Sequence, residues 1–199
     1  MAKLTKSDNH EELLRIYDEN NVFLGEMQTR GKVHEKELFH REVALWVIDK
    51  RNNSVLLQKR SLDKQFGAGK LGVLAGHVEG DDSLLGTVKK EATEELGVDI
   101  NYYEIQRIHN FSKFEPNNHC HIYHYALISY IPLIAMDKQD EEVERLIYMD
   151  YDFIKSRVLA GDPRFMIPND DNHKALFKNW INYLKINKIF FIYFKLNKI

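Results

Sequence analysis

Three glutamates in the segment EATEELG, residues 91–97, are the side chains of this sequence with the clearest chemical use. If the segment is helical, Glu91, Glu94 and Glu95 stand at i, i+3 and i+4, so their carboxylates crowd one face, and each like-charge pair costs roughly 0.2–0.5 kcal/mol. Gly97 is a natural helix stop, which puts Glu94 and Glu95 at the negative end of the helix dipole. This crowding calls for a compensating cation.

A magnesium site is the chemistry that such crowding favours. Mg²⁺ takes oxygen ligands, commonly one or two carboxylates together with substrate phosphates. The helix is entered through a glycine-rich stretch, residues 66–80, and this arrangement fits a site for such a hard cation. The alternative is a solvated acidic face, which is the commonest fate of a charge run. The spacing of the glutamates alone does not favour either the magnesium site or the solvated face.

The elements that must position these glutamates follow from turn signals and periodicity. Apolar-rich segments on either side of the turns at residues 18–21 and 50–53 are predicted to form two β-hairpins. A helix is predicted from about Ser83 to Leu96, capped by Asp82 or Ser83. Strands are predicted over 102–108, 121–131 and 145–150, and helices over 151–161 and 171–185. These elements predict an α/β (α+β) fold with a mixed β-sheet covered by helices.

Length and composition restrict the function classes. The chain has 199 residues, 44% of them hydrophobic, which suits one domain with extensions. A net charge of −2 gives no general attraction to nucleic acid or to an anionic membrane. Cys120 is the only cysteine, so an intrachain disulfide framework is excluded. No apolar run reaches the length of a membrane span or forms a signal peptide, so we expect a cytoplasmic location.

The wider stretch around the glutamates, GHVEGDDSLLGTVKKEATEELGV (Gly76–Val98), resembles the Nudix box. That motif reads Gly, five residues, Glu, seven residues, Arg-Glu, an aliphatic, any residue, Glu-Glu, any residue, Gly and an aliphatic. Asp82 stands where the motif has its first Glu, and Lys90 stands where it has Arg. Because these positions brace the loop against the helix in the family, we expect an Asp82–Lys90 pair as structural support of the loop.

The resemblance extends over roughly residues 12–160, to the isopentenyl-diphosphate-isomerase-like branch of the family. It implies a Nudix-type α/β/α sandwich over residues 1–185, with an N-terminal hairpin and a C-terminal helical extension, and leaves residues 186–199 as a tail of unknown role. True isomerases of this branch have a catalytic Cys directly before the Gly-His that enters the box. Here that residue is Ala75, which cannot transfer a proton.

The implied function is therefore Mg²⁺-dependent hydrolysis, with Mn²⁺ as a second option, of a nucleoside diphosphate linked to another group or of another organic diphosphate. Gly76, Glu91, Glu94 and Glu95 are the metal ligands that the resemblance implies. Glu91 is the first choice for the general base and Glu94 the second. An isopentenyl-diphosphate isomerase and a non-catalytic diphosphate-binding module are the alternatives. A small-molecule diphosphate is the expected partner, and the oligomeric state, a homodimer included, stays open.

Other candidates carry a weaker signal. Arg60 lies where related enzymes often contact a substrate phosphate, although a solvated strand end explains it equally well. Glu141 and Glu142 are candidates for a further metal ligand or base, with a solvated loop favoured. Histidines 34, 40 and 77 are an imprint of the isomerase metal site, but surface or hydrogen-bonded histidines are favoured there. A zinc site in HCHIYHY, residues 119–125, is disfavoured because strand alternation separates its histidines.

Overall fold

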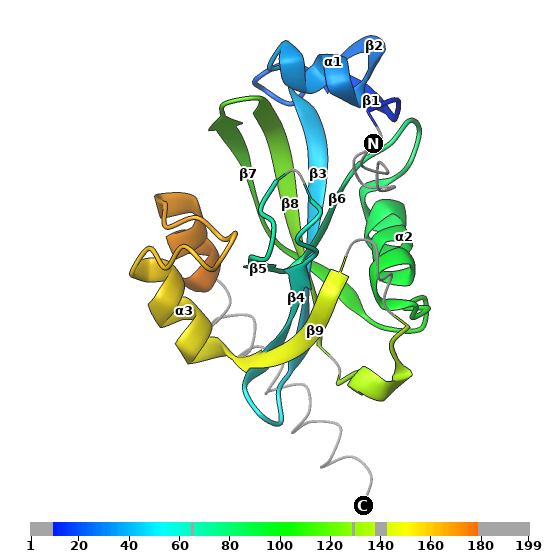
Figure 1. Cartoon of the computed structure of the whole chain (residues 1–199). Coiled ribbons are helices and arrows are strands. Elements are labelled where there is room, and N and C mark those ends of the chain that lie inside the picture. Colours follow the sequence, from blue (N-terminus) through cyan, green and yellow to red (C-terminus); the bar gives the residue numbers. More distant parts are fainter. Residues whose placement is uncertain (1–9, 65, 129, 138–142, 179–199) are drawn as a thin grey trace, which may run out of the picture.

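The computed structural model describes residues 10–64, 66–128, 130–137 and 143–178 (Figure 1). The strands and helices follow in this order: β1 (Leu13–Tyr17), β2 (Phe23–Thr29), α1 (Arg30–Glu35), β3 (His40–Asp49), β4 (Ser54–Arg60), β5 (Leu71–Gly72), β6 (Leu74–His77), α2 (Leu84–Leu96), β7 (Ile105–Glu115), β8 (Asn118–Ile128), η2 (Leu133–Ala135), β9 (Val143–Asp150) and α3 (Tyr151–Leu159). A further helix covers residues 171–178, where the described chain ends.

A seven-stranded mixed sheet forms the centre of the fold. Strands β5, β4, β3, β8 and β7 follow one another across it, while β6 pairs with β3 and β9 pairs with β4. Strands β3 and β8 are parallel and the other pairs are antiparallel. Strand β3 pairs with β6 through residues 42–45 and with β4 only at residues 48–49. One edge of β3 is therefore divided between β6 and β4, while β8 pairs along its other edge.

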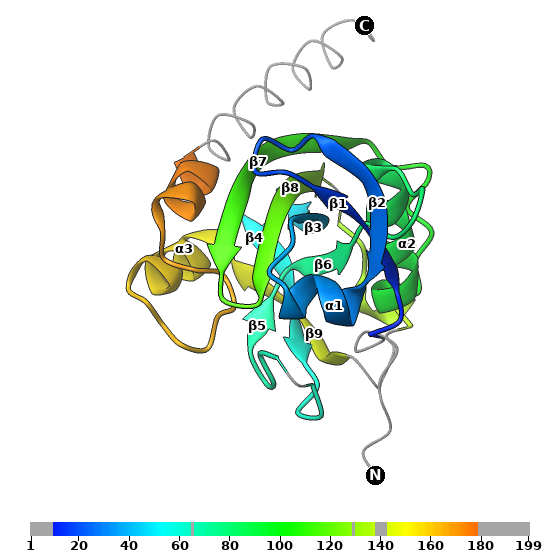
Figure 2. The same cartoon turned by 90° about the horizontal axis from the view of Figure 1, so that it is seen from above.

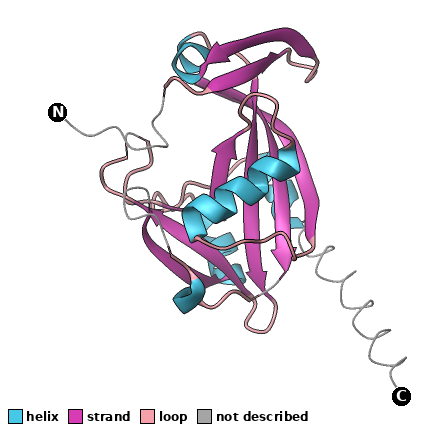
Figure 3. Cartoon of the chain, turned by 90° about the vertical axis from the view of Figure 1, so that its right-hand side faces the viewer, coloured by secondary structure: helices cyan, strands magenta, loops and turns pink. Residues whose placement is uncertain are grey.

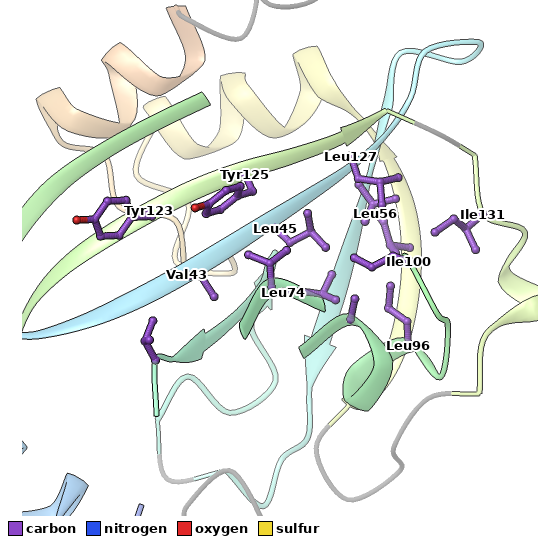
Figure 4. Close-up of a cluster of buried hydrophobic side chains, with 14 residues drawn as sticks. Val43, Leu45, Leu56, Leu74, Leu96, Ile100, Tyr123, Tyr125, Leu127 and Ile131 are labelled. Atoms are coloured by element: carbon purple, nitrogen blue, oxygen red, sulfur yellow. The ribbon is translucent and has the colours of Figure 1, made fainter. Parts of the chain in front are cut away.

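Helices cover both faces of this sheet, as Figure 1 shows with α2 on one side and α3 on the other. Alternate residues of β3 point to opposite faces. Val43, Leu45 and Val47 belong to the hydrophobic core under α2. The same core also contains residues of β8 (Figure 4). Trp46 and Ile48 join the core under α3 and the helix at 171–178. The predicted α/β/α sandwich with a mixed sheet is therefore confirmed.

The N-terminal hairpin lies at one end of the sheet, beside α1 (Figures 2 and 3). Strands β1 and β2 pair with each other in a separate two-stranded sheet, which confirms the predicted hairpin. Its turn is closed by Asp18, whose carboxylate accepts hydrogen bonds from two backbone N–H groups of the turn. The Gly80 N–H donates to the Leu13 carbonyl at 2.8 Å, and Arg15 pairs with Asp81. The hairpin is thus attached to the loop that precedes α2.

The predicted second hairpin, the helix near residues 83–96 and the later strands are all present, whereas the short helix α1 was not predicted. Some predictions fall outside the described residues. They concern the tail at 186–199, the end of the predicted C-terminal helix, and the candidates Glu141 and Glu142. Among the helices of the described ranges, none combines the length and apolar character that crossing a bilayer requires.

Candidate active site

Helix α2 presents the predicted glutamates because its sequence fixes where it begins and ends. Ser83 is the N-cap, and its Oγ accepts a hydrogen bond from a backbone N–H of the first turn at 3.0 Å. Gly97 ends the helix with φ 65°, in the left-handed region that favours glycine. Val88, Ala92 and Leu96 are fully buried against the sheet. This buried stripe fixes the rotation of the helix and so the direction of the remaining side chains.

Gly76 and Glu91 lie in direct contact. A Cβ atom added to Gly76 would stand 2.0 Å from Glu91 Oε1 and 2.2 Å from its carboxyl carbon. No side chain fits in that space while Glu91 keeps this position. A larger residue at position 76 would displace the carboxylate from the backbone of β6, whereas with glycine the two groups that the Nudix-box resemblance pairs as metal ligands do meet.

Glu95 is the most enclosed of the three glutamates, with 6% of its surface exposed. Gln58, on β4, is also buried and donates a hydrogen bond from Nε2 to Glu95 Oε1 at 3.0 Å. An ionised carboxylate at this depth needs such donors or a cation. Gln58, which lies on the sheet, therefore orients the carboxylate of Glu95.

All five predicted metal-binding and substrate-binding residues line one cavity of about 430 Å³. They are Gly76, Glu91, Glu94, Glu95 and Arg60. A cavity of this size is within the range of small-molecule sites. Carboxylates and one backbone segment gathered on one wall are the hard oxygen donors that Mg²⁺ prefers, so the residues present fit that ion.

The loop brace differs from the expectation. Lys90 Nζ donates to Glu79 Oε1 at 2.8 Å, whereas the predicted partner, Asp82, is exposed. Burial opposes the charge on Lys90, but the hydrogen bond to Glu79, together with the negative charges of Glu79, Glu94 and Asp82, outweighs it and raises the pKa of the lysine. The Asp82 N–H donates to the Glu79 carbonyl in a tight turn. Asp82 therefore supports the loop through its backbone, and the longer glutamate reaches the lysine.

Arg60 stands at the end of β4, on the rim of the same cavity. Its Nε donates to the carbonyl of Phe66 at 3.1 Å, and its backbone pairs with Lys70 and Gly69. The guanidinium therefore holds the loop between β4 and β5 closed while it lines the cavity. Both arrangements that the sequence left open at Arg60, a phosphate contact and a solvated strand end, are compatible with a position on the rim.

Three histidines from separate elements meet beside the cavity: two of them, His34 and His77, line it, whereas His40 is fully buried and is not a lining residue. His34, His40 and His77 lie on α1, β3 and β6, and one ring nitrogen of each lies within 4.8 Å of the others. Their ring centroids are 5.1–5.3 Å apart. The Nε2 atom of each is buried and makes no hydrogen bond to any of the residues described. The favoured interpretation, surface or hydrogen-bonded histidines, describes His40 at its Nδ1, which lies 3.3 Å from the Leu38 carbonyl, but it does not account for the three Nε2 atoms.

Glu42 adds a carboxylate to this cluster. Its Oε1 lies 3.5 Å from His40 Nε2 and 3.6 Å from His77 Nε2, which is long for a good hydrogen bond. Burial disfavours the charge on Glu42, but Lys113, 3.8 Å away, and the histidines outweigh it and hold its pKa well below the usual value. Burial lowers the pKa of His34 to about 4 and that of His77 well below its usual value. Burial thus favours the neutral form of His34 and His77, which is the form of imidazole that ligates metals.

Sequence patterns gave no signal for several polar residues of the cavity. Glu12 and Arg30 form an ion pair at 3.2 Å on its wall, and burial raises the pKa of Glu12. Lys113 comes from β7 and lies close to Glu42. None of these residues stands at a fixed spacing from the glutamate helix. Only the pairing of β3 with β6 and β8, and the docking of the hairpin, bring them together.

The cluster HCHIYHY divides between different environments, as strand alternation predicted. His121 Nε2 donates to the Asp18 carbonyl at 2.8 Å, whereas His124 Nδ1 accepts a hydrogen bond from Trp46 Nε1 at 3.1 Å in the opposite core. The zinc interpretation therefore finds no support in the described residues. Cys120 is fully buried, and burial raises the pKa of its thiol. It is a packed residue, as its sequence context indicated.

The sequence and the structure were compared with those of known proteins. A model of the NUDIX domain matches residues 38–168. Nudix hydrolase 3 of Arabidopsis thaliana is 30% identical over 171 residues, which are 81% of this chain and 22% of that protein. An uncharacterised Nudix hydrolase of Clostridium acetobutylicum is 31% identical over 151 residues, 71% of each chain. The chain thus spans about a fifth of the Arabidopsis relative and most of the bacterial one.

Two further matches bear on the branch and the fold. An isopentenyl-diphosphate Δ-isomerase of Serratia proteamaculans is 27% identical over 103 residues, 51% of this chain and 55% of that protein. The crystal structure of DR0079 from Deinococcus radiodurans superimposes with a TM-score of 0.62 at 19% identity. That alignment covers 75% of this chain and 90% of the other. At this identity the structural match speaks for the fold alone.

Proposed function

The chain belongs to the Nudix hydrolase family, whose members act on phosphoanhydride bonds, and on that premise we propose that it hydrolyses an organic diphosphate with Mg²⁺, or alternatively Mn²⁺, bound beside α2. The substrate class is a nucleoside diphosphate linked to another group, or another organic diphosphate. The observation that carries the proposal is the contact of Gly76 with Glu91, because a Cβ atom at position 76 would occupy the space that this carboxylate takes beside β6.

The ion would be held by Glu91, Glu94, Glu95 and the backbone of Gly76. When bound, it neutralises the phosphate oxygens that otherwise shield the phosphoanhydride from water. The surroundings suit that ligand set, since Gln58 fixes one oxygen of Glu95 at 3.0 Å. The hydrogen bond between Lys90 and Glu79 holds the box loop against α2.

The chain's own residues would supply the remaining steps. Glu91 is the first choice to accept the proton of the attacking water, and Glu94 the second, because metal ligation and base duty compete for the same lone pairs. Arg60, on the rim, would contact a substrate phosphate through the part of its guanidinium that does not hold the Phe66 carbonyl. The substrate would thus lie between α2 and the end of β4.

The isomerase alternative is not favoured, although the match to the Serratia enzyme supports a place in the isomerase-like branch. Ala75 lies on the cavity wall with its side chain exposed, directly before Gly76. A methyl group there has no proton to give. We therefore expect no conversion of isopentenyl diphosphate to its dimethylallyl isomer, and formation of that isomer from labelled substrate would reverse this assignment.

A transition metal at the three-histidine cluster is a second proposal for the same cavity. Neutral imidazoles suit zinc and other transition metals, and Glu42 offers a carboxylate beside them. Equilibrium zinc titration, followed by the metal content after dialysis, should find one ion that is lost in His40→Ala and kept in His119→Ala, a control outside the cluster. Equal zinc retention by both variants, or none by the wild type, would reject this second site.

The hydrolase proposal is tested by a screen of many organic diphosphates with Mg²⁺, in which phosphate release is read after a coupling phosphatase. We expect turnover of at least one compound, and loss of that turnover in Glu91→Gln. Glu104→Gln is the matched control, because Glu104 is exposed and outside the cavity. Binding of nucleotides without turnover of any compound would favour the non-catalytic binding module instead.

A further inference from the structure

Phe66 stands out among the residues of the cavity wall. Its side chain is 69% exposed although it is large and apolar. An exposed phenylalanine on an open surface needs no explanation. Phe66, however, lines the same cavity as Arg60 and the three glutamates of α2. Among the described lining residues it is the only phenyl, phenol or indole ring.

The backbone that carries this ring is held in place. The Phe66 carbonyl accepts a hydrogen bond from Arg60 Nε at 3.1 Å. The next residue, Gly67, has φ +65°, and a Cβ there would stand 2.8 Å from Met166 Sδ, so the turn requires glycine. Lys70 N–H donates to the Gly67 carbonyl at 3.0 Å and closes the turn. The ring is therefore presented from a fixed loop.

Met166, the neighbour of this turn, is fixed as well and lines the cavity too. Its N–H donates to the Leu71 carbonyl at 2.8 Å, and a bridge joins Leu71 to Phe165. Thioether sulfur and a phenyl ring together make a polarisable apolar surface. The remaining wall is dominated by charged and polar side chains. The cavity thus offers a phosphate end and, next to Arg60, an apolar end.

We propose that Phe66 is a specificity-determining residue, whose ring stacks on the purine or pyrimidine base of a substrate with its diphosphate held between Arg60 and α2. This inference rests on the proposed function for the direction in which the diphosphate lies. A flat base covers a phenyl face with offset stacking. An aliphatic diphosphate covers less of the ring, and inorganic pyrophosphate covers none of it.

Equilibrium binding tests this assignment without depending on turnover. The probes are ADP, isopentenyl diphosphate and inorganic pyrophosphate, measured by calorimetry with Ca²⁺ in place of Mg²⁺ to slow any hydrolysis. Base stacking on an aromatic side chain contributes enough for its removal to weaken binding by about 5- to 150-fold. Phe66→Ala should weaken ADP binding within that range and leave pyrophosphate within about twofold, and Phe66→Trp should preserve ADP binding.

Tyr102→Ala is the matched control, because Tyr102 is an exposed aromatic residue outside the cavity, and it should change none of the three affinities. Three results would overturn the assignment: equal weakening of ADP and isopentenyl diphosphate in Phe66→Ala, an unchanged ADP affinity in that variant, or no binding of ADP by the wild type. Selective loss of ADP binding in a protein that hydrolyses no diphosphate would instead preserve the role of Phe66 and reject the hydrolase proposal.

Discussion

Glu95 provides the sharpest test at the scale of single residues. In Glu95→Gln, relief of the repulsion in α2 raises stability by a few tenths of a kcal/mol. The hydrogen bond from Gln58 becomes weaker because its acceptor is no longer charged. These effects oppose each other, so we expect the metal-free stability to stay within about 0.5 kcal/mol of the wild type. Activity should nevertheless collapse, because an amide is a poor ligand for a hard cation.

Thermal melts with and without Mg²⁺ measure both halves of this prediction. An ion at a hundred times its dissociation constant stabilises the wild type by about 2.7 kcal/mol through mass action. The Gln variant should lose most of that gain. Equal magnesium shifts in the two proteins, with activity retained by the variant, would make the glutamate face ordinary solvated surface.

The spacing of residues in the sequence predicted which side chains lie in the cavity better than it predicted which side chains contact one another. The contact of Gly76 with Glu91 follows from a helix whose length and end were legible in the sequence. The partner of Lys90 did not follow, because Glu79 and Asp82 lie on one tight turn and only the longer side chain reaches the lysine. The close approach of His34, His40 and His77 does not follow from their spacing for a related reason. The members of this cluster are placed by strand pairing, which single positions do not reveal.

At the scale of elements, the start of α2 decides how firmly the glutamates are held. Ser83→Ala removes the acceptor that the first turn uses at 3.0 Å. The loss of an N-cap costs about 1 kcal/mol, so urea unfolding should report that decrease with an unchanged m-value. Because Glu94 and Glu95 lie at the other end of the helix, activity at saturating Mg²⁺ should fall less than tenfold. Ser156→Ala in α3 changes no N-cap and is the control; an equal loss there would contradict the capping argument.

Elements with strong local signals were predictable and those made by distant pairing were not. Both hairpins, α2 and α3 carry turn residues or caps in the sequence. Helix α1 has only six residues and no side-chain cap. Strand β6 has four residues within the glycine-rich stretch, where the sequence predicts one short strand, but its partner β3 does not follow from any local pattern. The antiparallel pairing of β4 with β9 joins residues that are 83 (Arg60 with Val143) to 96 (Ser54 with Asp150) positions apart, which no local pattern encodes.

At the scale of the whole molecule, a second group of histidines, His109, His124 and His173, should make the stability of the fold depend on pH. His124 packs among Trp46, Phe111 and His173, where the helix at 171–178 meets the sheet. Burial holds the pKa of His124 well below its usual 6.5, and burial also lowers the pKa values of His173 and His109. The unfolded chain therefore binds more protons below pH 6.5 than the folded one, so stability is lost as pH falls through that value.

Urea unfolding at pH 7.5 and at pH 5 measures this loss. Each additional proton bound by the unfolded state contributes a slope of about 1.4 kcal/mol per pH unit. His124→Gln keeps an acceptor for Trp46 and removes one titrating group, so its stability should fall less steeply with acid. Parallel pH profiles for the two proteins would assign the acid sensitivity to other groups.

The parallel pairing of β3 with β8 also has a consequence for the order in which the chain folds. His40 pairs with Cys120 and Ile48 with Ile128, so every contact of this central pair joins residues 80 positions apart. Loop closure over that distance is unfavourable before native contacts repay it, and such topologies fold slowly. During synthesis, β3 therefore emerges with the edge that β8 pairs with left open until β8 has left the ribosome, and with the face under α3 uncovered until that helix follows. The nascent chain is exposed to aggregation during that interval, when a chaperone would have most to do.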